Sequence, residues 1–310
     1  MKRRLFVLAV LIFFFSILLF PGAAFAGASR GILLWFGTVL PTLLPFMIAA
    51  GLMVRTNAVD LLSRLTGPVL GRVLHVSPCG SFAVTAGFLC GYPMGAKVTA
   101  DLLRQGRISR EEAGYLLSFT NNISPMFAVS YVALRFMPDP AFSGPSILIL
   151  FLAPLLGSRL FYRCRKGQLE KRRGSLHPQK RRPFSAGVVD ASMMDGFDAI
   201  TRVGGYMMLF SILTEMAGLL PGSHALPARC ASAFLEMTSG VEMLYLLPAP
   251  AGLRWILIMS LCSSGGLCAA AQTYSMIHGT GLRISVYMAE KLATAGVTSL
   301  LCIIYLYVLR

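Results

Sequence analysis

The sequence has few charged residues. Only 13% of its 310 residues are Asp, Glu, Lys or Arg, whereas soluble domains average about 25%. Hydrophobic residues make up 55%, and the mean hydropathy is +0.68. This composition excludes an ordinary soluble domain and predicts an all-α, multi-pass membrane protein with roughly eight apolar elements of about 20 residues each.

The usual signatures of catalysis and metal binding are also missing. The seven cysteines contain no CxxC pair, and the four histidines contain no HExxH motif. No P-loop, dinucleotide fingerprint or Gly-x-Ser-x-Gly elbow occurs. We therefore expect no enzyme activity, no cofactor and no metal. An intramembrane enzyme is the weaker alternative, which the loss of a specific product in a mutant strain would support.

Positive charge is in excess and is concentrated in one place. Ten of the 28 basic residues lie between Arg159 and Arg182, and such clusters beside membrane spans mark the cytoplasmic face. The net charge of +15 therefore indicates a lipid bilayer as partner and no nucleic acid. We predict a basic cytoplasmic connector at 163–202, with a specific lipid head-group site as the alternative.

The first residues allow two interpretations. Lys2-Arg3-Arg4 precede the apolar run Leu5–Phe20, and Ala24-Phe25-Ala26 matches a signal-peptide cleavage site. The same pattern fits a retained span that enters from the cytoplasm. We favour the retained span, a signal-anchor helix within residues 1–30.

Further apolar segments predict a series of spans. These are 31–54, 113–136, 146–161, 204–220, 256–277 and 282–309. Pro41 and Pro45 should kink the first of them. Segment 58–74 contains Arg64 and Arg72, which favours an amphipathic helix at the membrane interface. Segment 228–247 is ambiguous because it carries two glutamates.

Two segments contain what a lipid-facing helix avoids. One is Gly91-Tyr-Pro-Met-Gly-Ala-Lys97, and the other is Asn121-Asn122. An unpaired backbone group in hydrocarbon costs several kcal/mol, so broken helices persist there only when they line a cavity or are buried in protein. We predict that both segments line a site. The alternative is that the glycines only permit close helix packing while Lys97 extends to the interface.

The distribution of charge supports a re-entrant hairpin at 81–103. With the N-terminus inside, simple alternation of spans would put the basic connector outside the cell. A hairpin that enters and leaves on the cytoplasmic side returns the connector to the cytoplasm. The alternative is that 58–74 crosses the membrane, which its two arginines disfavour.

Similar short motifs recur in the two halves of the chain. Leu89-Cys90 and Arg107-Ile-Ser109 in the first half match Leu261-Cys262 and Arg283-Ile-Ser285 in the second. We predict two inverted repeats, 31–162 and 203–310, each with a Gly-broken helical hairpin. This architecture is typical of secondary transporters.

Several motifs resemble those of the YlbJ-type sporulation integral membrane proteins, which share the nucleoside-recognition Gate domain with the spore maturation proteins. The motifs are Leu43-Leu-Pro-Phe46, Gly91–Lys97, Ser118–Asn122, Gly204-Gly-Tyr206, Leu235–Gly240, Gly265–Cys268 with Gln272, and Tyr287 with Lys291. The resemblance covers 31–136 and 203–292. It implies a multi-pass protein of the bacterial inner membrane that acts in sporulation and is related to transporter-like gates.

These observations define a candidate site. The predicted substrate-binding residues are Gly91, Tyr92, Pro93, Gly95, Lys97, Asn121, Asn122, Glu236, Thr238, Gly265, Gly266, Gln272 and Lys291. Lys97 would be the counter-charge for an anion or the partner of a carboxylate such as Glu236. Glu215 and Glu290 are further ionisable residues in apolar segments.

The predicted function is a permease that moves a small polar or charged solute or ion by alternating access. The alternative is a non-transporting scaffold in spore-envelope assembly. Its partners would be other sporulation membrane proteins or a second copy of the chain.

Overall fold

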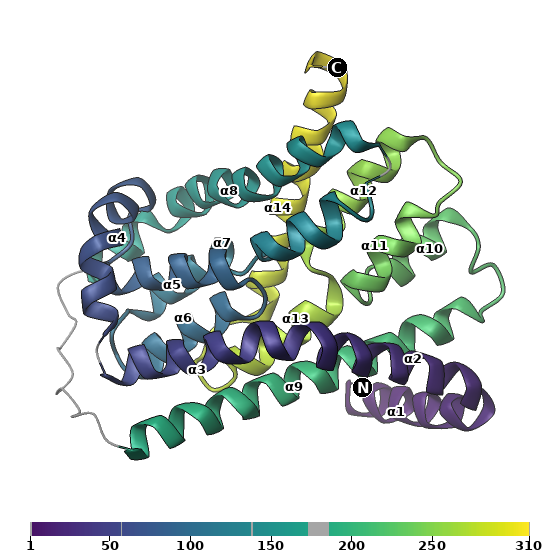
Figure 1. Cartoon of the computed structure of the whole chain (residues 1–310), viewed down its shortest axis with the longest axis horizontal. Coiled ribbons are helices and arrows are strands. Elements are labelled where there is room, and N and C mark those ends of the chain that lie inside the picture. Colours follow the sequence, from purple (N-terminus) through teal and green to yellow (C-terminus); the bar gives the residue numbers. More distant parts are fainter. Residues whose placement is uncertain (1, 57, 138, 173–185, 310) are drawn as a thin grey trace.

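The computed structural model describes residues 2–56, 58–137, 139–172 and 186–309, and within these ranges every regular element is a helix. Figure 1 shows their arrangement. The α-helices are α1 (Lys2–Leu19), α2 (Pro21–Leu34), α3 (Leu40–Thr56), α4 (Val59–Leu74), α5 (Pro78–Cys90), α6 (Met94–Arg104), α7 (Arg110–Thr120), α8 (Ser143–Arg172), α9 (Ala186–Gly218), α10 (Leu226–Ala233), α11 (Met237–Tyr245), α12 (Ala251–Ser264), α13 (Gly266–Ile277) and α14 (Ile284–Ile304). Shorter helical turns are η1 (Trp35–Val39), η2 (Phe127–Ala133), η3 (Pro140–Phe142) and η4 (Tyr305–Leu309).

Several of these helices are suited to a membrane. Within the described ranges, four are long and apolar enough to cross one: Pro21–Thr56, Pro140–Arg163, Ala251–Ile277 and Ile284–Val308. Helices α4 and α5 make a fifth if they are counted as one span bent by 90°. Large apolar side chains such as Leu61 and Leu148 are exposed on the outside, as expected of a surface that faces lipid. The polytopic class is confirmed, with fewer complete spans than the eight elements predicted.

The predicted spans differ from the observed helices mainly in where the helices begin and end. The predicted span 31–54 belongs to a helix that already begins at Pro21, since proline is favoured in the first turn of a helix. The predicted span 113–136 is divided between α7 and η2. The predicted span 204–220 belongs to the longer α9, which carries acidic residues near its start.

A long antiparallel helix pair forms one side of the molecule. Helices α2 and α3 lie alongside α9 (Figure 1). A Cβ added at Gly31 would lie 2.7 Å from the Cα of Met208, so the absence of a side chain lets the backbones approach closely. The Trp35 indole donates to the Ile200 carbonyl at 2.9 Å. Because α9 begins at Ala186 and α8 ends at Arg172, helices occupy both ends of the predicted connector, whose residues 173–185 lie outside the described ranges.

Capping residues begin the shorter helices. Ser77 Oγ accepts from the Gly80 N–H at 3.0 Å at the start of α5. Ser109 Oγ accepts from the Glu112 N–H at 3.1 Å, which confirms the predicted helix start at Arg110. The Glu112 carboxylate accepts from the Ser77 N–H at 2.6 Å. The two caps therefore hold the starts of α5 and α7 together.

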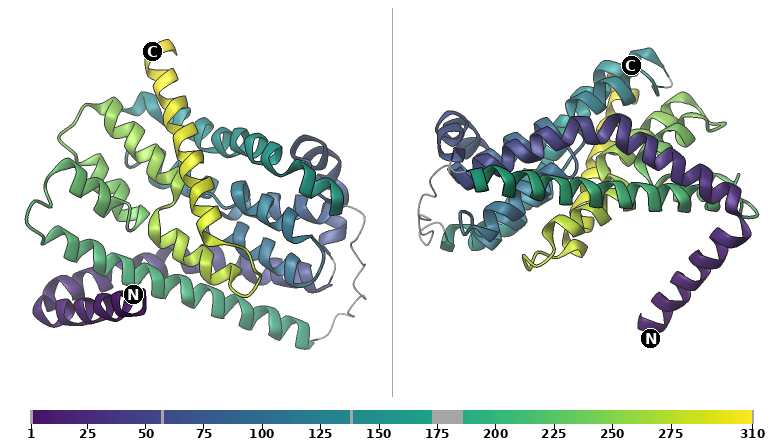
Figure 2. Two further views of the ribbon diagram at one scale, coloured as in Figure 1. Left: turned by 180° about the vertical axis from the view of Figure 1, so that it is seen from behind. Right: turned by 60° about the horizontal axis from the view of Figure 1, so that its bottom comes forward.

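Four interruptions lie near the middle of the molecule, where α14 crosses it (Figure 2). They separate α5 from α6, α7 from η2, α10 from α11, and α12 from α13. Gly91 and Gly265 adopt positive φ angles of 83° and 82°, which residues with a Cβ rarely tolerate. The Tyr92 hydroxyl donates to the Ser263 carbonyl at 3.2 Å. The first and fourth interruptions are therefore in direct contact.

Candidate functional site at the helix interruptions

The side chain of Asn121 connects three helices at the end of α7. It is completely buried. Its Nδ2 donates to Thr273 Oγ1 of α13 at 2.8 Å and to the Tyr287 hydroxyl of α14 at 2.9 Å. Its Oδ1 accepts from the Ala96 N–H of α6 at 3.3 Å. One amide thus satisfies buried polar groups from three separate elements, as a low-polarity interior requires.

Lys291 lies beside this amide. Its side chain is only 1% exposed. The ammonium donates to the Asn121 carbonyl and to Asn122 Oδ1, both at 3.0 Å. It also lies 5.2 Å from the centroid of the Tyr92 ring, within range of a cation–π interaction. The structure therefore brings together four predicted site residues, Tyr92, Asn121, Asn122 and Lys291.

The predicted glycines pack these elements closely. A Cβ at Gly91 would lie 2.5 Å from the Ser124 nitrogen, and one at Gly95 would lie 3.0 Å from the Asn121 Cα. A Cβ at Gly265 would lie 2.8 Å from the Tyr92 ring. Pro93 is the residue before α6. Close packing, the alternative interpretation of these glycines, therefore describes the geometry, and it is also what brings the polar side chains together.

Glu236 and its neighbours form a second group. The Glu236 carboxylate precedes α11 and accepts from the Thr238 N–H at 3.0 Å and from the Ser239 N–H at 2.8 Å. It is 4% exposed. Gly266 lies against the Phe234 carbonyl. In this position Glu236 serves as a helix cap, which compensates the cost of burying the carboxylate.

Gln272 extends this group along α13. Its Nε2 donates to the Cys268 sulfur at 3.3 Å. The Cys268 N–H donates to the Leu235 carbonyl at 3.0 Å, and the Leu267 N–H donates to the Phe234 carbonyl at 2.8 Å. The start of α13 is thereby attached to the interruption between α10 and α11.

We expect Glu236→Ala to lower the free energy of unfolding by about 2 kcal/mol, because a buried helix start loses its cap. Thermal unfolding of the purified protein in detergent measures this change. The control is Glu242→Ala, which removes an exposed carboxylate from the same helix. Equal stability of the two variants would contradict a capping role.

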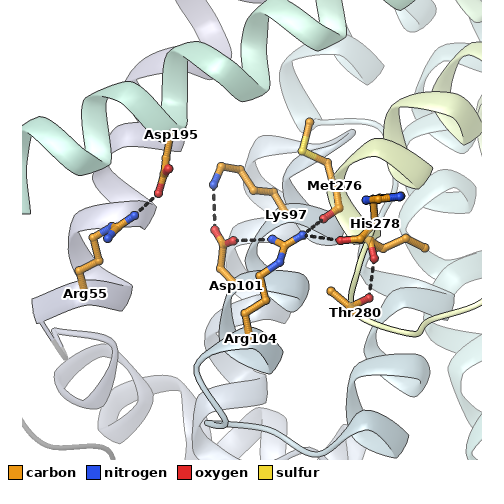
Figure 3. A network of polar contacts seen from close by, with 9 residues as sticks. Arg55, Lys97, Asp101, Arg104, Asp195, Met276, His278 and Thr280 are labelled. Atoms are coloured by element: carbon orange, nitrogen blue, oxygen red, sulfur yellow. Dashed lines mark hydrogen bonds and ion pairs between the residues drawn. The ribbon is translucent and has the colours of Figure 1, made fainter.

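Lys97 lies in a separate pocket, and Figure 3 shows the polar contacts of the residues around it. The pocket has a volume of about 540 Å³ and lies between α3, α6, α9 and α13. Lys97 pairs with Asp101 at 2.8 Å, rather than with Glu236 as suggested from the sequence. Asp101 also pairs with Arg104 at 3.1 Å. Lys97 is thus held among charged groups on α6 itself.

The far wall of this pocket comes from distant parts of the chain. Arg55 of α3 pairs with Asp195 of α9 (Figure 3). Arg104 donates to the Met276 and His278 carbonyls at 2.7 and 3.1 Å, and so caps the end of α13. Sequence reasoning missed these residues. Asp101 could have been found because it follows Lys97 by four positions, the spacing of an ion pair on one helix face. No sequence pattern indicated Asp195.

The remaining predicted ionisable residues are in ion pairs. Glu215 pairs with Arg30, and Glu290 pairs with Arg165. Pairing explains how α9 and α14 accommodate these carboxylates. Among the described residues, no three His, Cys, Asp or Glu side chains are grouped as metal ligands would be.

Comparison with known proteins shows a similar membrane protein. The sporulation integral membrane protein YlbJ of Bacillus subtilis (strain 168) is 28% identical to this chain over 221 residues, which are 64% of this chain and 53% of that protein. This similarity supports a YlbJ-type assignment. The chain spans about half the length of this relative. No family model and no solved structure matches this chain.

Together with the apolar helices, the similarity establishes a multi-pass membrane protein of a bacterium. In this chain, three motifs of the resemblance begin at helix interruptions. Gly91–Lys97 begins at the break after α5 and continues into α6, Leu235–Gly240 begins at the break after α10 and continues into α11, and Gly265–Cys268 begins at the break after α12 and continues into α13. The motifs therefore mark positions where backbone geometry restricts the choice of residue.

Proposed function

We propose that this membrane protein is a permease for a small polar or charged solute. The observation that carries the proposal is the meeting of interrupted helices around Asn121 and Lys291. Interrupted helices are tolerated at membrane depth only where protein or a cavity surrounds them. Transporters use such interruptions to present polar groups to a solute.

The pocket around Lys97 supports the proposal. It contains cationic and anionic side chains within a largely apolar chain. Charges in such surroundings are costly, so their presence favours a functional role. One wall is α6, which begins at the interruption after Gly91. A shift of α5 and α6 would therefore change the pocket. We assign the solute to this pocket, with Lys97 and Asp101 as its charged contacts.

A transport assay tests this assignment. Vesicles that contain the purified chain are incubated with the small-molecule fraction of a bacterial extract, and accumulated solutes are identified by mass spectrometry. We expect at least one polar solute to accumulate, and Lys97→Met to reduce its accumulation about tenfold or more, as the loss of one charged contact would. The control is Arg163→Gln, an exposed cation on α8.

The rival function is a scaffold that moves nothing. It is favoured by the description of the B. subtilis relative as a sporulation integral membrane protein, which names no solute. If the vesicles accumulate no solute and the folded Lys97→Met protein restores spore formation in a deletion strain, the scaffold is correct. If solute accumulation and spore formation are both lost, the permease is supported.

We also propose that α5 and α6 form a re-entrant hairpin within the first of two inverted repeats. The adjacent packing of α5 and α6 and the contact between the Gly91 and Gly265 interruptions support it. Labelling with an impermeant thiol reagent tests it. One variant keeps only Cys79 at the start of α5, and another has Leu103→Cys near the end of α6 as its single cysteine. We expect both to react from the cytoplasmic side, and reaction from opposite sides would contradict the hairpin.

A further inference from the structure

We propose that Asn121, Asn122 and Tyr92 form a binding site for a monovalent cation, and that the ammonium group of Lys291 fills this site. The groups around the ammonium are the kind that hold a small cation. Two are oxygen atoms at 3.0 Å, and the third is an aromatic face at 5.2 Å. Carbonyl oxygens are the ligands that monovalent cations meet in channels.

The end of α7 explains why these oxygens are free to bind a cation. The helix ends at Thr120, and Asn121 follows it with a non-helical backbone. The last carbonyls of a helix lack partners within the helix and carry its negative dipole end. The Asn122 Nδ2 donates to the Phe119 carbonyl, which turns its Oδ1 toward Lys291. The site is therefore electronegative although it is built from neutral groups.

The charge of Lys291 is not balanced by an adjacent acid. Among the ion pairs of the described residues, none includes Lys291, and the neighbouring carboxylate of Glu290 pairs with Arg165 of α8. The other titratable groups here are Tyr92, Tyr287 on the previous turn of α14, and Cys262 of α12. Neutral oxygens and the face of the Tyr92 ring thus stabilise the charge of the Lys291 ammonium, as they would stabilise a bound sodium or potassium ion.

This site deepens the proposed function, and its consequence for transport rests on that function. A tethered ammonium takes the place of a dissolved cation, so solute movement would require no sodium or potassium at this position. Lys291 would then act as a positioning residue that holds the end of α7, the Tyr92 segment and α14 together.

Thermal unfolding of the purified full-length protein tests the cation site without reference to transport. At constant ionic strength, sodium and potassium should leave the unfolding temperature of the wild type unchanged. Lys291→Met keeps the side-chain volume but removes the charge, and it should lower the unfolding temperature by roughly 5 °C or more. Lys291→Arg, which keeps a cation, should lie between Lys291→Met and the wild type.

Lys291→Ala gives the sharper result because it leaves space for a dissolved cation. Propylammonium should restore part of its lost stability, whereas choline, which is too large, should not, and neither should stabilise Lys291→Met. The proposal is overturned if Lys291→Met is as stable as the wild type, or if propylammonium does not raise the unfolding temperature of folded Lys291→Ala. If Lys291→Ala does not fold, the unfolding temperatures of the other two variants decide: the proposal requires Lys291→Arg to unfold at a higher temperature than Lys291→Met. These unfolding temperatures do not depend on transport, so a failed transport assay would not change their interpretation.

Discussion

Gly87→Ala is expected to lower the free energy of unfolding by about 3 kcal/mol or more. Gly87 lies on α5, and a Cβ there would overlap the carbonyl oxygen of Thr120 and lie 3.1 Å from the Cα of Gly95. Both obstacles are backbone atoms, so no change of rotamer relieves the overlap. Instead α5 would have to move away from the end of α7, which separates the groups of the candidate site.

The yield of monodisperse protein and its unfolding temperature in detergent measure this effect. Gly205→Ala on α9 is the matched control, because a Cβ there meets nothing within 4 Å. It should match or slightly exceed the wild type, since alanine favours helix more than glycine does. If Gly87→Ala were as stable as Gly205→Ala, the close approach of α5 to α7 would be wrong.

Asn121→Leu is expected to cost about 2–4 kcal/mol, because a buried donor or acceptor that loses its partner costs about 1–3 kcal/mol. The substitution keeps the volume of the side chain but removes its contacts with Ala96, Thr273 and Tyr287. The Ala96 N–H is affected most, because it lies in the first turn of α6, where the helix supplies no acceptor. Chemical or thermal unfolding measures the loss.

A double-mutant cycle separates the network from simple loss of volume. Tyr287→Phe removes the hydroxyl that accepts from Asn121, and its cost should be much smaller when Asn121 is already Leu. Ser130→Ala is the control, because the Ser130 hydroxyl is exposed and donates to Met126 within its own helix. Strictly additive costs for Asn121→Leu and Tyr287→Phe would show that the two side chains do not cooperate.

The sequence by itself determined the class of the protein and some of the places where its helices stop. Composition alone predicts a membrane protein, because lipid favours apolar side chains whatever the fold. The interruptions at Gly91–Pro93 and Gly265, and the helix start after Ser109, could be predicted because glycine, proline and capping residues act on the backbone near them. These effects depend on neighbours within a few residues.

Only the tertiary structure decided which side chains meet. Lys97 and Lys291 are both buried lysines in apolar segments, yet the first pairs with Asp101 and the second contacts Asn121 and Asn122. Glu236 likewise caps its own helix instead of meeting Lys97. The reason is physical: the contact between Lys291 and Asn121 joins positions 170 residues apart, and it depends on how α7 and α14 cross, which no local pattern specifies.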